Sequence, residues 1–173
     1  MFVRSSAPII HGARALPDQR ELVAAFGGHP VEPGQNHPLI PLAHALADLH
    51  RQRHDDPLAT AGIDCRRAEL VSAIDTWVIR RVPQRQSTAQ IRAESIGATM
   101  DRMAAAYVHA SHLLHTAEKV SDDRVHAAWY RLAQLADHWT DLTIGAPNAA
   151  PREIKIRWLW WRGLLARAAT AST

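Results

Sequence analysis

Apolar residues recur along most of this chain with the period of an α-helix rather than that of a strand. In residues 38–54 the leucines repeat at steps of three and four, which places them on one face of a helix. The same period continues through residues 57–82, 87–117 and 122–144, and no segment alternates strictly between apolar and polar residues. The pattern therefore predicts four long helices and an all-α fold.

Local signals indicate where several of the helices begin and end. Asp18 and Glu21 have the spacing of a capping box, which predicts a short helix over residues 18–26 that ends at a pair of glycines. Asp56 followed by Pro57 is typical of an N-cap and a first helical position. These two residues therefore predict the start of the second long helix.

The third and fourth long helices have the most regular apolar stripes. Ser87 and Gln90 form a second capping box, which predicts that the third helix begins near residue 88. Its inward residues recur at alternating steps of four and three, as in a coiled coil; they are Ala89, Ala93, Ile96, Met100, Met103, Tyr107, Ala110, Leu114 and Ala117. Ser121 is placed to cap the fourth helix. The inner stripe of that helix consists of Val125, Trp129, Leu132, Ala136, Trp139 and Leu142.

Long helices joined by short links predict an antiparallel four-helix bundle over residues 38–146. Residues 1–37 precede it as an arm with the short helix, and residues 147–173 follow it as a basic, amphipathic C-terminal helix. The coiled-coil-like seam of the third helix also predicts self-association, by helix pairing with two-fold symmetry.

The predicted C-terminal helix carries apolar residues on two sides. One side is expected to pack on the bundle, and it consists of Ile154, Trp158, Trp161, Leu165 and Ala168. Trp160 and Leu164 lie away from that side, close to Arg157 and Arg162. Because tryptophan and arginine often anchor protein interfaces, we expect these four residues to contact another protein or a second copy of the chain.

The net charge of +3 is concentrated at the C-terminal end. Residues 146–173 contain five basic residues and one acidic residue, whereas residues 1–145 carry a net charge of −1. A near-neutral body is unusual for a protein that neutralises many phosphates, so nucleic-acid binding depends on the C-terminal helix alone. The single cysteine excludes an internal disulfide, and no apolar run is long enough to span a membrane. We expect a cytoplasmic protein.

Motifs that would identify a catalytic or metal site are missing from the sequence. It contains no Gly-rich phosphate loop, no nucleophile elbow and no zinc-protease motif. His50 and His54 are four residues apart on one predicted helix and could supply two metal ligands, but a third ligand would have to come from another helix. Solvent-facing histidines are the simpler interpretation, and no cofactor is predicted.

One polar stripe on the third helix is a candidate site. Glu94, Gly97 and Asp101 lie on it, immediately beside the apolar seam. Because a glycine inside a helix costs about 1 kcal/mol relative to alanine, Gly97 predicts that a neighbouring element approaches closely there. If the helices enclose a pocket, the candidate catalytic residues are His50, Glu94, Asp101 and Arg102. Interhelical salt bridges that fix the helix register are the favoured alternative.

Several segments resemble the domain-of-unknown-function 4254 family; they are LADLHRQRHDDP, RAELVSAIDTWV, ESIGATMDRM and HAAWYRLAQLADHWTDL. The family shows Leu-His-x-x-Asn, Ile-Asp and Glu-Thr/Ser-x-Gly-x-x-x-Asp-Arg-Leu elements in this order. In this chain Arg53 stands at the place of the asparagine and Met103 at the place of the last leucine. The resemblance covers about residues 37–145. It implies a small helical bacterial or phage protein with no established activity.

No catalytic constellation is complete, and the distinctive features of the sequence are surfaces. We therefore predict a non-enzymatic interaction or regulatory protein that acts through protein–protein contacts and forms a homodimer. One alternative is a small-molecule enzyme with a polar or metal site at Glu94, Asp101 and His50. The other is a nucleic-acid-binding protein that uses its C-terminal helix.

Overall fold

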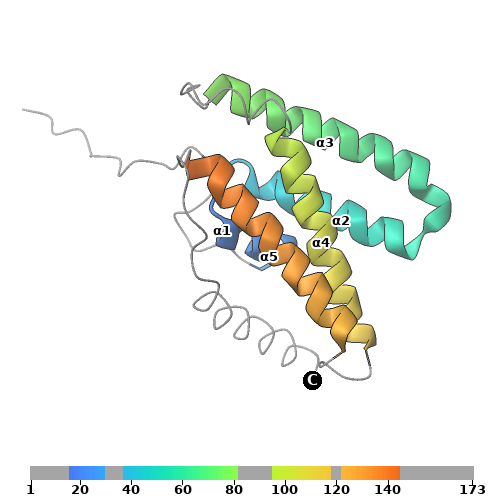
Figure 1. Cartoon of the computed structure of the whole chain (residues 1–173). Coiled ribbons are helices and arrows are strands. Elements are labelled where there is room, and N and C mark those ends of the chain that lie inside the picture. The colour runs from blue at the N-terminus through green and yellow to red at the C-terminus, as the bar shows by residue number, and fades with distance from the viewer. Residues whose placement is uncertain (1–15, 30–36, 82–94, 118–121, 145–173) are drawn as a thin grey trace, which may run out of the picture.

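The computed structural model describes residues 16–29, 37–81, 95–117 and 122–144, and every regular element within these ranges is helical (Figure 1). The elements are α1 (Gln19–Phe26), α2 (Ile40–Asp55), the 3-10 helix η1 (Pro57–Ala59), α3 (Thr60–Arg81), α4 (Ile96–Thr116) and α5 (Asp123–Ile144). The predicted all-α fold is confirmed. None of the described helices is long and apolar enough to cross a membrane. The predicted C-terminal helix and most of the N-terminal arm lie outside the described residues.

The helices pack as a bundle in which α4 contacts every other long helix. Figure 1 shows α2 and α3 as one antiparallel pair, joined through η1, and α4 and α5 as a second pair. α4 packs against α1, α2, α3 and α5, whereas α5 contacts only α4 and α1 among the described helices. The helical bundle is therefore confirmed, and α3 is left with neighbours on one side only, from η1, α2 and α4.

The core is built from the stripes that the helical period predicts. Met100 and Met103 of α4 and Leu132 and Trp139 of α5 are fully buried, as is Leu46 of α2. The main core cluster also receives α1, which contributes Leu22, Ala25 and Phe26. Burial of such side chains is the main stabilising contribution to a helical domain.

The short helix α1 has the capping box that the sequence predicts. The Asp18 carboxylate accepts hydrogen bonds from the backbone N–H groups of Arg20 and Glu21, at 2.8 Å and 2.9 Å. The Asp18 N–H in turn donates to the Glu21 carboxylate at 2.6 Å. After α1 the chain turns at Gly28, whose φ of 70° is a conformation that glycine adopts without steric cost.

The predicted start of the third long helix is wrong. α4 begins at Ile96, and its N-cap is Ser95, which has an extended backbone (φ −75°, ψ 153°). The Ser95 hydroxyl accepts the Ala98 N–H at 3.0 Å, so Ser95 performs the capping that the sequence pattern had assigned to Ser87. Ser87 and Gln90 lie outside the described residues.

Helix α3 is the least buried of the long helices whose burial is described throughout. Only Ile63 and Ile74 of its 22 residues are buried. Four further apolar residues of α3 are partly buried and pack against the core; they are Leu70, Val71, Trp77 and Val78. Leu58 of the preceding η1 and Ile79 near the end of α3 are apolar residues that are 98% and 68% exposed. Half of this helix therefore faces away from the bundle.

Candidate functional site

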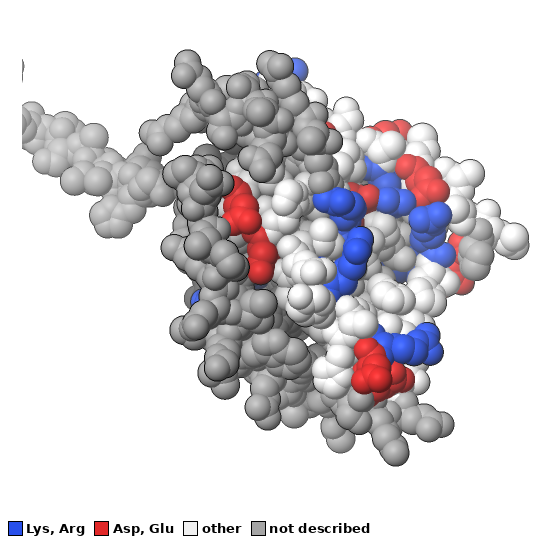
Figure 2. Space-filling model, viewed as in Figure 1, with Lys and Arg blue, Asp and Glu red and all other residues white. Residues whose placement is uncertain are grey.

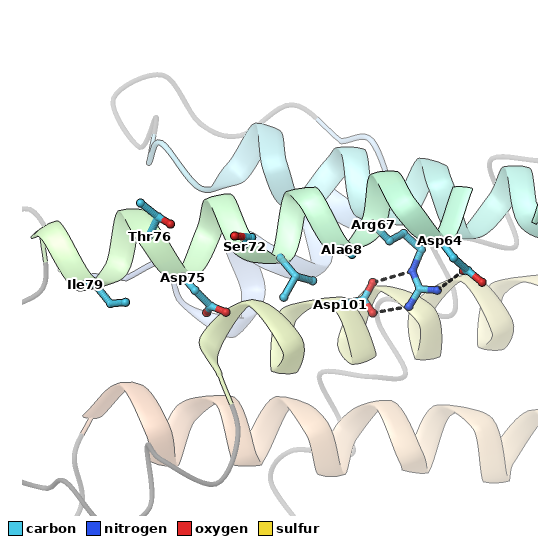
Figure 3. A pocket seen from close by; sticks show the side chains of 9 residues that line it. Asp64, Arg67, Ala68, Ser72, Asp75, Thr76, Ile79 and Asp101 are labelled. Atoms are coloured by element: carbon cyan, nitrogen blue, oxygen red, sulfur yellow. Dashed lines mark hydrogen bonds and ion pairs between the residues drawn. The ribbon is translucent and has the colours of Figure 1, made fainter. Parts of the chain in front are cut away.

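Asp101 lies where three helices meet, and it is one of two buried polar or charged residues in the described core. His50 of α2 lies with its Nε2 atom 2.8 Å from Oδ1 of Asp101. Arg67 of α3 grips the same carboxylate with two donors, Nε to Oδ1 at 3.1 Å and Nη2 to Oδ2 at 2.5 Å (Figure 3). A fork of two parallel bonds is the geometry that arginine prefers with a carboxylate. Asp101 therefore ties α2 and α3 to α4.

The ion-pair network continues outward from Arg67 towards the surface. Arg67 Nη1 donates to Asp64 at 2.8 Å, one turn earlier in α3. Arg53, at the end of α2, lies 3.5 Å from the other oxygen of Asp64. The Arg53–Asp64 pair is largely exposed, so it contributes little to stability, whereas the pair of Arg67 with Asp101 is mostly removed from water.

These contacts set the protonation of the cluster. Burial alone raises the pKa of Asp101, but the hydrogen bonds from His50 and Arg67, together with the nearby positive charge, outweigh it and lower the pKa to about 2. The hydrogen bond to Asp101, with the charges of Asp101 and Asp64, raises the pKa of Arg67 in spite of its partial burial. The carboxylate therefore stays ionised at neutral pH.

Gly97 marks the closest approach of α3 and α4, as the sequence predicts. A Cβ atom at this position would lie 2.5 Å from the carbonyl oxygen of Val71 and 3.1 Å from the Asp75 carboxylate. The Gly97 N–H donates to Asp75 at 2.8 Å, so a side chain of α3 satisfies one of the free donors at the start of α4. The glycine is needed because the two backbones leave no room for a side chain.

A hollow of about 530 Å³ runs along this junction, between α3 and the first half of α4 (Figure 3). Its charged lining consists of Asp64, Arg67 and Asp75 of α3 and Asp101 of α4, and the rest of its lining also comes from α3. Within this hollow the Arg67 guanidinium and the Asp101 carboxylate form an ion pair with each other, so neither charge is left to bind a ligand ion.

The family model described as a protein of unknown function (DUF4254) matches residues 59–148, more than half of the chain. The chain belongs to the DUF4254 family. The matched DUF4254 region contains Asp64, Arg67, Gly97 and Asp101, whereas His50 precedes it. No curated protein and no solved structure matches the chain.

The structure brings some of the predicted site residues of this DUF4254 protein together. His50 and Asp101 are in direct contact. This contact joins α2 to α4, as in the interhelical salt bridges that were the favoured interpretation of the sequence. Glu94 lies outside the described residues, and Arg102 is exposed. The arginine that contacts Asp101 is Arg67, which sequence reasoning missed. A usable signal was present, because Asp64, Arg67, Val71 and Asp75 recur at steps of three and four beside the apolar face of α3.

The two histidines considered as metal ligands do not share a site. His50 contacts Asp101, whereas the ring of His54 lies 4.0 Å from the ring of His112 on α4. Within the described ranges, no group of three or more histidine, cysteine, aspartate or glutamate residues is arranged to hold a metal ion. The residues predicted to bind a partner lie outside the described residues; they are Arg157, Trp160, Arg162 and Leu164.

Proposed function

We propose that this DUF4254 protein is a non-enzymatic interaction protein that binds another protein chain with the outward side of α3. The supporting observation is a continuous exposed row on that side, which we call the α3 stripe. It consists of Leu58, Ala61, Cys65, Ala68, Glu69, Ser72, Thr76 and Ile79, and all eight residues are exposed. Leu58 belongs to η1, and the seven residues of α3, placed at 100° per residue, cover a sector of roughly 100° on one side of the helix.

The apolar and small residues of the α3 stripe favour contact with protein. Leu58 and Ile79 are two of the three large hydrophobic residues that are exposed in the described part of the chain. Between them the stripe presents mostly small side chains, over which another helix can pack closely. Apart from Glu69 the stripe carries no charge, and charged residues border it, as at many interaction surfaces.

The state of the polar cluster also favours this proposal over the catalytic alternative. A general base works best when its pKa lies near the working pH, but the pKa of Asp101 is about 2. Both of its oxygens accept hydrogen bonds from protein donors. The cluster is therefore better suited to holding three helices in register than to exchanging protons with a substrate.

The charge distribution of the described residues does not single out a nucleic-acid surface. Figure 2 shows basic and acidic side chains close to one another on the face that it presents. The excess of positive charge in the sequence is confined to residues 146–173. Nucleic-acid binding thus still rests on the predicted C-terminal helix, which lies outside the described residues.

Cys65 provides a direct test, because it is the only cysteine of the chain and lies in the α3 stripe. We expect a thiol-alkylating reagent to modify Cys65 more slowly in cells that produce the full chain than in a dilute purified sample. Ala68→Arg should remove this protection, since a large cation in the stripe would prevent docking.

The matched control places the thiol on α5. Ala127 is an exposed alanine of that helix, so Cys65→Ser combined with Ala127→Cys reports general crowding and reagent access. Its alkylation should be equally fast in cells and in dilute solution. If Cys65 reacts in cells as fast as in dilute solution, the proposal is wrong.

A further inference from the structure

We infer that the partner on the α3 stripe is a second copy of this chain, with the two α3 helices antiparallel about a two-fold axis between Ala68 and Glu69. This inference rests on the proposed function, because it names the occupant of the same surface.

The residues of the stripe pair across its centre when the helix is reversed. From Leu58 to Ala68 they follow at steps of three, four and three, and from Glu69 to Ile79 they again follow at three, four and three. Every α-helix has this symmetry of spacing, so the residue types that it pairs decide whether the patch is self-complementary. Closed dimers need such a self-complementary patch, in which residue i meets residue j and residue j meets residue i.

Two of the pairs created by this symmetry match in size and character, whereas at the centre Ala68 meets the Glu69 carboxylate of the second copy. Leu58 meets Ile79 of the second copy, so the two large exposed hydrophobic residues of the stripe cover each other. Cys65 meets Ser72 of the second copy near the centre, where small side chains allow the helices to approach.

Charge complementarity supports the second copy and fixes its direction. Asp55 and Asp56 lie just before the stripe, and Arg80 and Arg81 end it, with all four exposed. An antiparallel pair places the acidic end of each helix against the basic end of the other. A parallel pair would place like charges together, which disfavours it.

Two hollows border the stripe. The hollow of about 530 Å³ lies towards α4, a second one of about 810 Å³ is lined by Cys65, Glu69, Ala73 and Trp77, and both include Ala68, Ser72 and Thr76 of the stripe. All stripe residues are exposed in the described part of the chain, so a partner helix can reach them. Since a single helix pair buries less than the roughly 800 Å² per partner of a standard interface, we expect a weak, micromolar dimer.

The first experiment is sedimentation of the full chain over a range of concentrations. We expect a monomer–dimer equilibrium that Ala68→Arg weakens roughly tenfold or more, the effect of losing about 1.4 kcal/mol of association free energy. The matched control is Ala127→Arg on α5, which should leave dimerisation unchanged. Helical circular dichroism spectra of both variants confirm folding.

Charge reversal tests the antiparallel direction. Arg80→Glu combined with Arg81→Glu makes both ends of the stripe acidic, and a separate Asp55→Arg variant cancels the net negative charge of the other end, because Asp56 remains. In an antiparallel dimer each variant alone should dimerise more weakly than the natural chain, and mixing the two should recover part of the association, because the acidic end of the first variant then meets the basic end of the second. In a parallel dimer the natural chain already places like charges together, so neither variant alone would be weaker than the natural chain.

A disulfide tests the register. Ser72→Cys places a second thiol opposite Cys65 of the other copy, so mild oxidation of this variant should give a covalent dimer. The natural chain should not, because the two Cys65 residues of a pair lie about 10 Å apart along the helix axis, beyond the reach of a disulfide. The control is Ala127→Cys, which keeps Cys65 and should stay monomeric on a non-reducing gel.

The outcomes separate this inference from the proposed function. If the purified chain stays monomeric while Cys65 is protected in cells, a different protein occupies the stripe and the second copy is wrong. If a dimer forms but Ala68→Arg and Ala127→Arg weaken it equally, the stripe is not its interface. If Cys65 is never protected, the proposed function fails as well.

Discussion

At the scale of single residues, Asp101 does the most to connect the described helices. It is 9% exposed, and it accepts from His50 on α2 and from Arg67 on α3. A buried carboxylate is costly to desolvate, and its partners offset that cost only while all of them remain. The cluster is thus sensitive to the loss of any one charge.

Because of Asp101, the stability of the protein should fall at low pH. Its pKa is near 4 in an unfolded chain but about 2 in the fold, so the folded state gains about 2 kcal/mol above pH 4. This contribution is lost as the pH falls from about 4 towards 2. Urea unfolding at several pH values measures it.

The control for this acid dependence is Asp101→Asn. It removes the titrating group and leaves Arg67 with only Asp64 as a charged partner, so we expect a loss of roughly 3 kcal/mol at pH 7. The fall in stability below pH 4 should then be smaller than in the natural chain. An equally steep fall would show that other carboxylates cause it.

Substitution by alanine should change the stability of the protein in opposite directions at Gly97 and Gly62. At Gly97 the added Cβ meets the backbone of Val71 at 2.5 Å, so helices α3 and α4 must separate, at a cost of roughly 1–3 kcal/mol. At Gly62 in α3 nothing lies within 4 Å, and Gly62→Ala should stabilise by about 0.5–1 kcal/mol. Thermal unfolding of both variants tests the pair, and losses of similar size would contradict the close approach.

At the scale of the elements, two side-chain hydrogen bonds fix the start of α4. Ser95 caps it locally through the Ala98 N–H, and Asp75 caps it from α3 through the Gly97 N–H. The second bond joins residues 22 positions apart, so it forms only when the two helices are packed. The position of α3 and the beginning of α4 are therefore coupled.

Removing the cap from α3 should loosen α4 at its first turn. Asp75→Ala should cost about 1 kcal/mol, the usual contribution of an N-cap side chain. It should also speed hydrogen exchange of the Gly97 amide more than that of the Ala98 amide, which keeps Ser95. Asp75→Asn retains an acceptor and should cost less, and an equal loss in both variants would mean that the hydrogen bond is unimportant.

At the scale of the whole molecule, the segment before α1 is held against the last described helix. Trp139 of α5 is fully buried, and its indole N–H donates to the carbonyl oxygen of Pro17 at 3.0 Å. Thr140 adds a hydrogen bond to Gln19 at 3.3 Å. These contacts span more than 120 positions, and α1 packs against α2, α4 and α5.

Trp139→Phe should therefore loosen α1 selectively. The smaller ring leaves a gap and leaves the Pro17 carbonyl without this donor, which should cost roughly 2–3 kcal/mol in total. Hydrogen exchange should rise in α1 more than in the middle of α4. Thr140→Val, which loses only a partly buried hydrogen bond, should have a much smaller effect, and equal exchange in α1 for both variants would contradict the role of Trp139.

What the sequence alone determined about this protein is local. The period of three and four set the inner stripes of α4 and α5, and the capping box of Asp18 and Glu21 set the start of α1. Both depend on residues within a few positions of each other, where helical geometry is nearly constant. The close approach at Gly97 was also predicted, because a glycine inside a helix indicates that a neighbour leaves no room for a side chain. His50 and Asp101 were grouped as candidates, but their direct contact was not specified.

Only the tertiary structure decided which helices meet and which residues complete their contacts. Ser95 caps α4 locally, and the neighbouring Gly97 N–H reaches Asp75 only because α3 packs there. Likewise, several arginines lie on polar stripes of the sequence, and any of them could have been the partner of Asp101. The position of α3 decides that the partner is Arg67. The tertiary structure also decides that one side of α3 is exposed. Helix periodicity shows which residues share a side, but contacts between distant segments decide whether that side is covered.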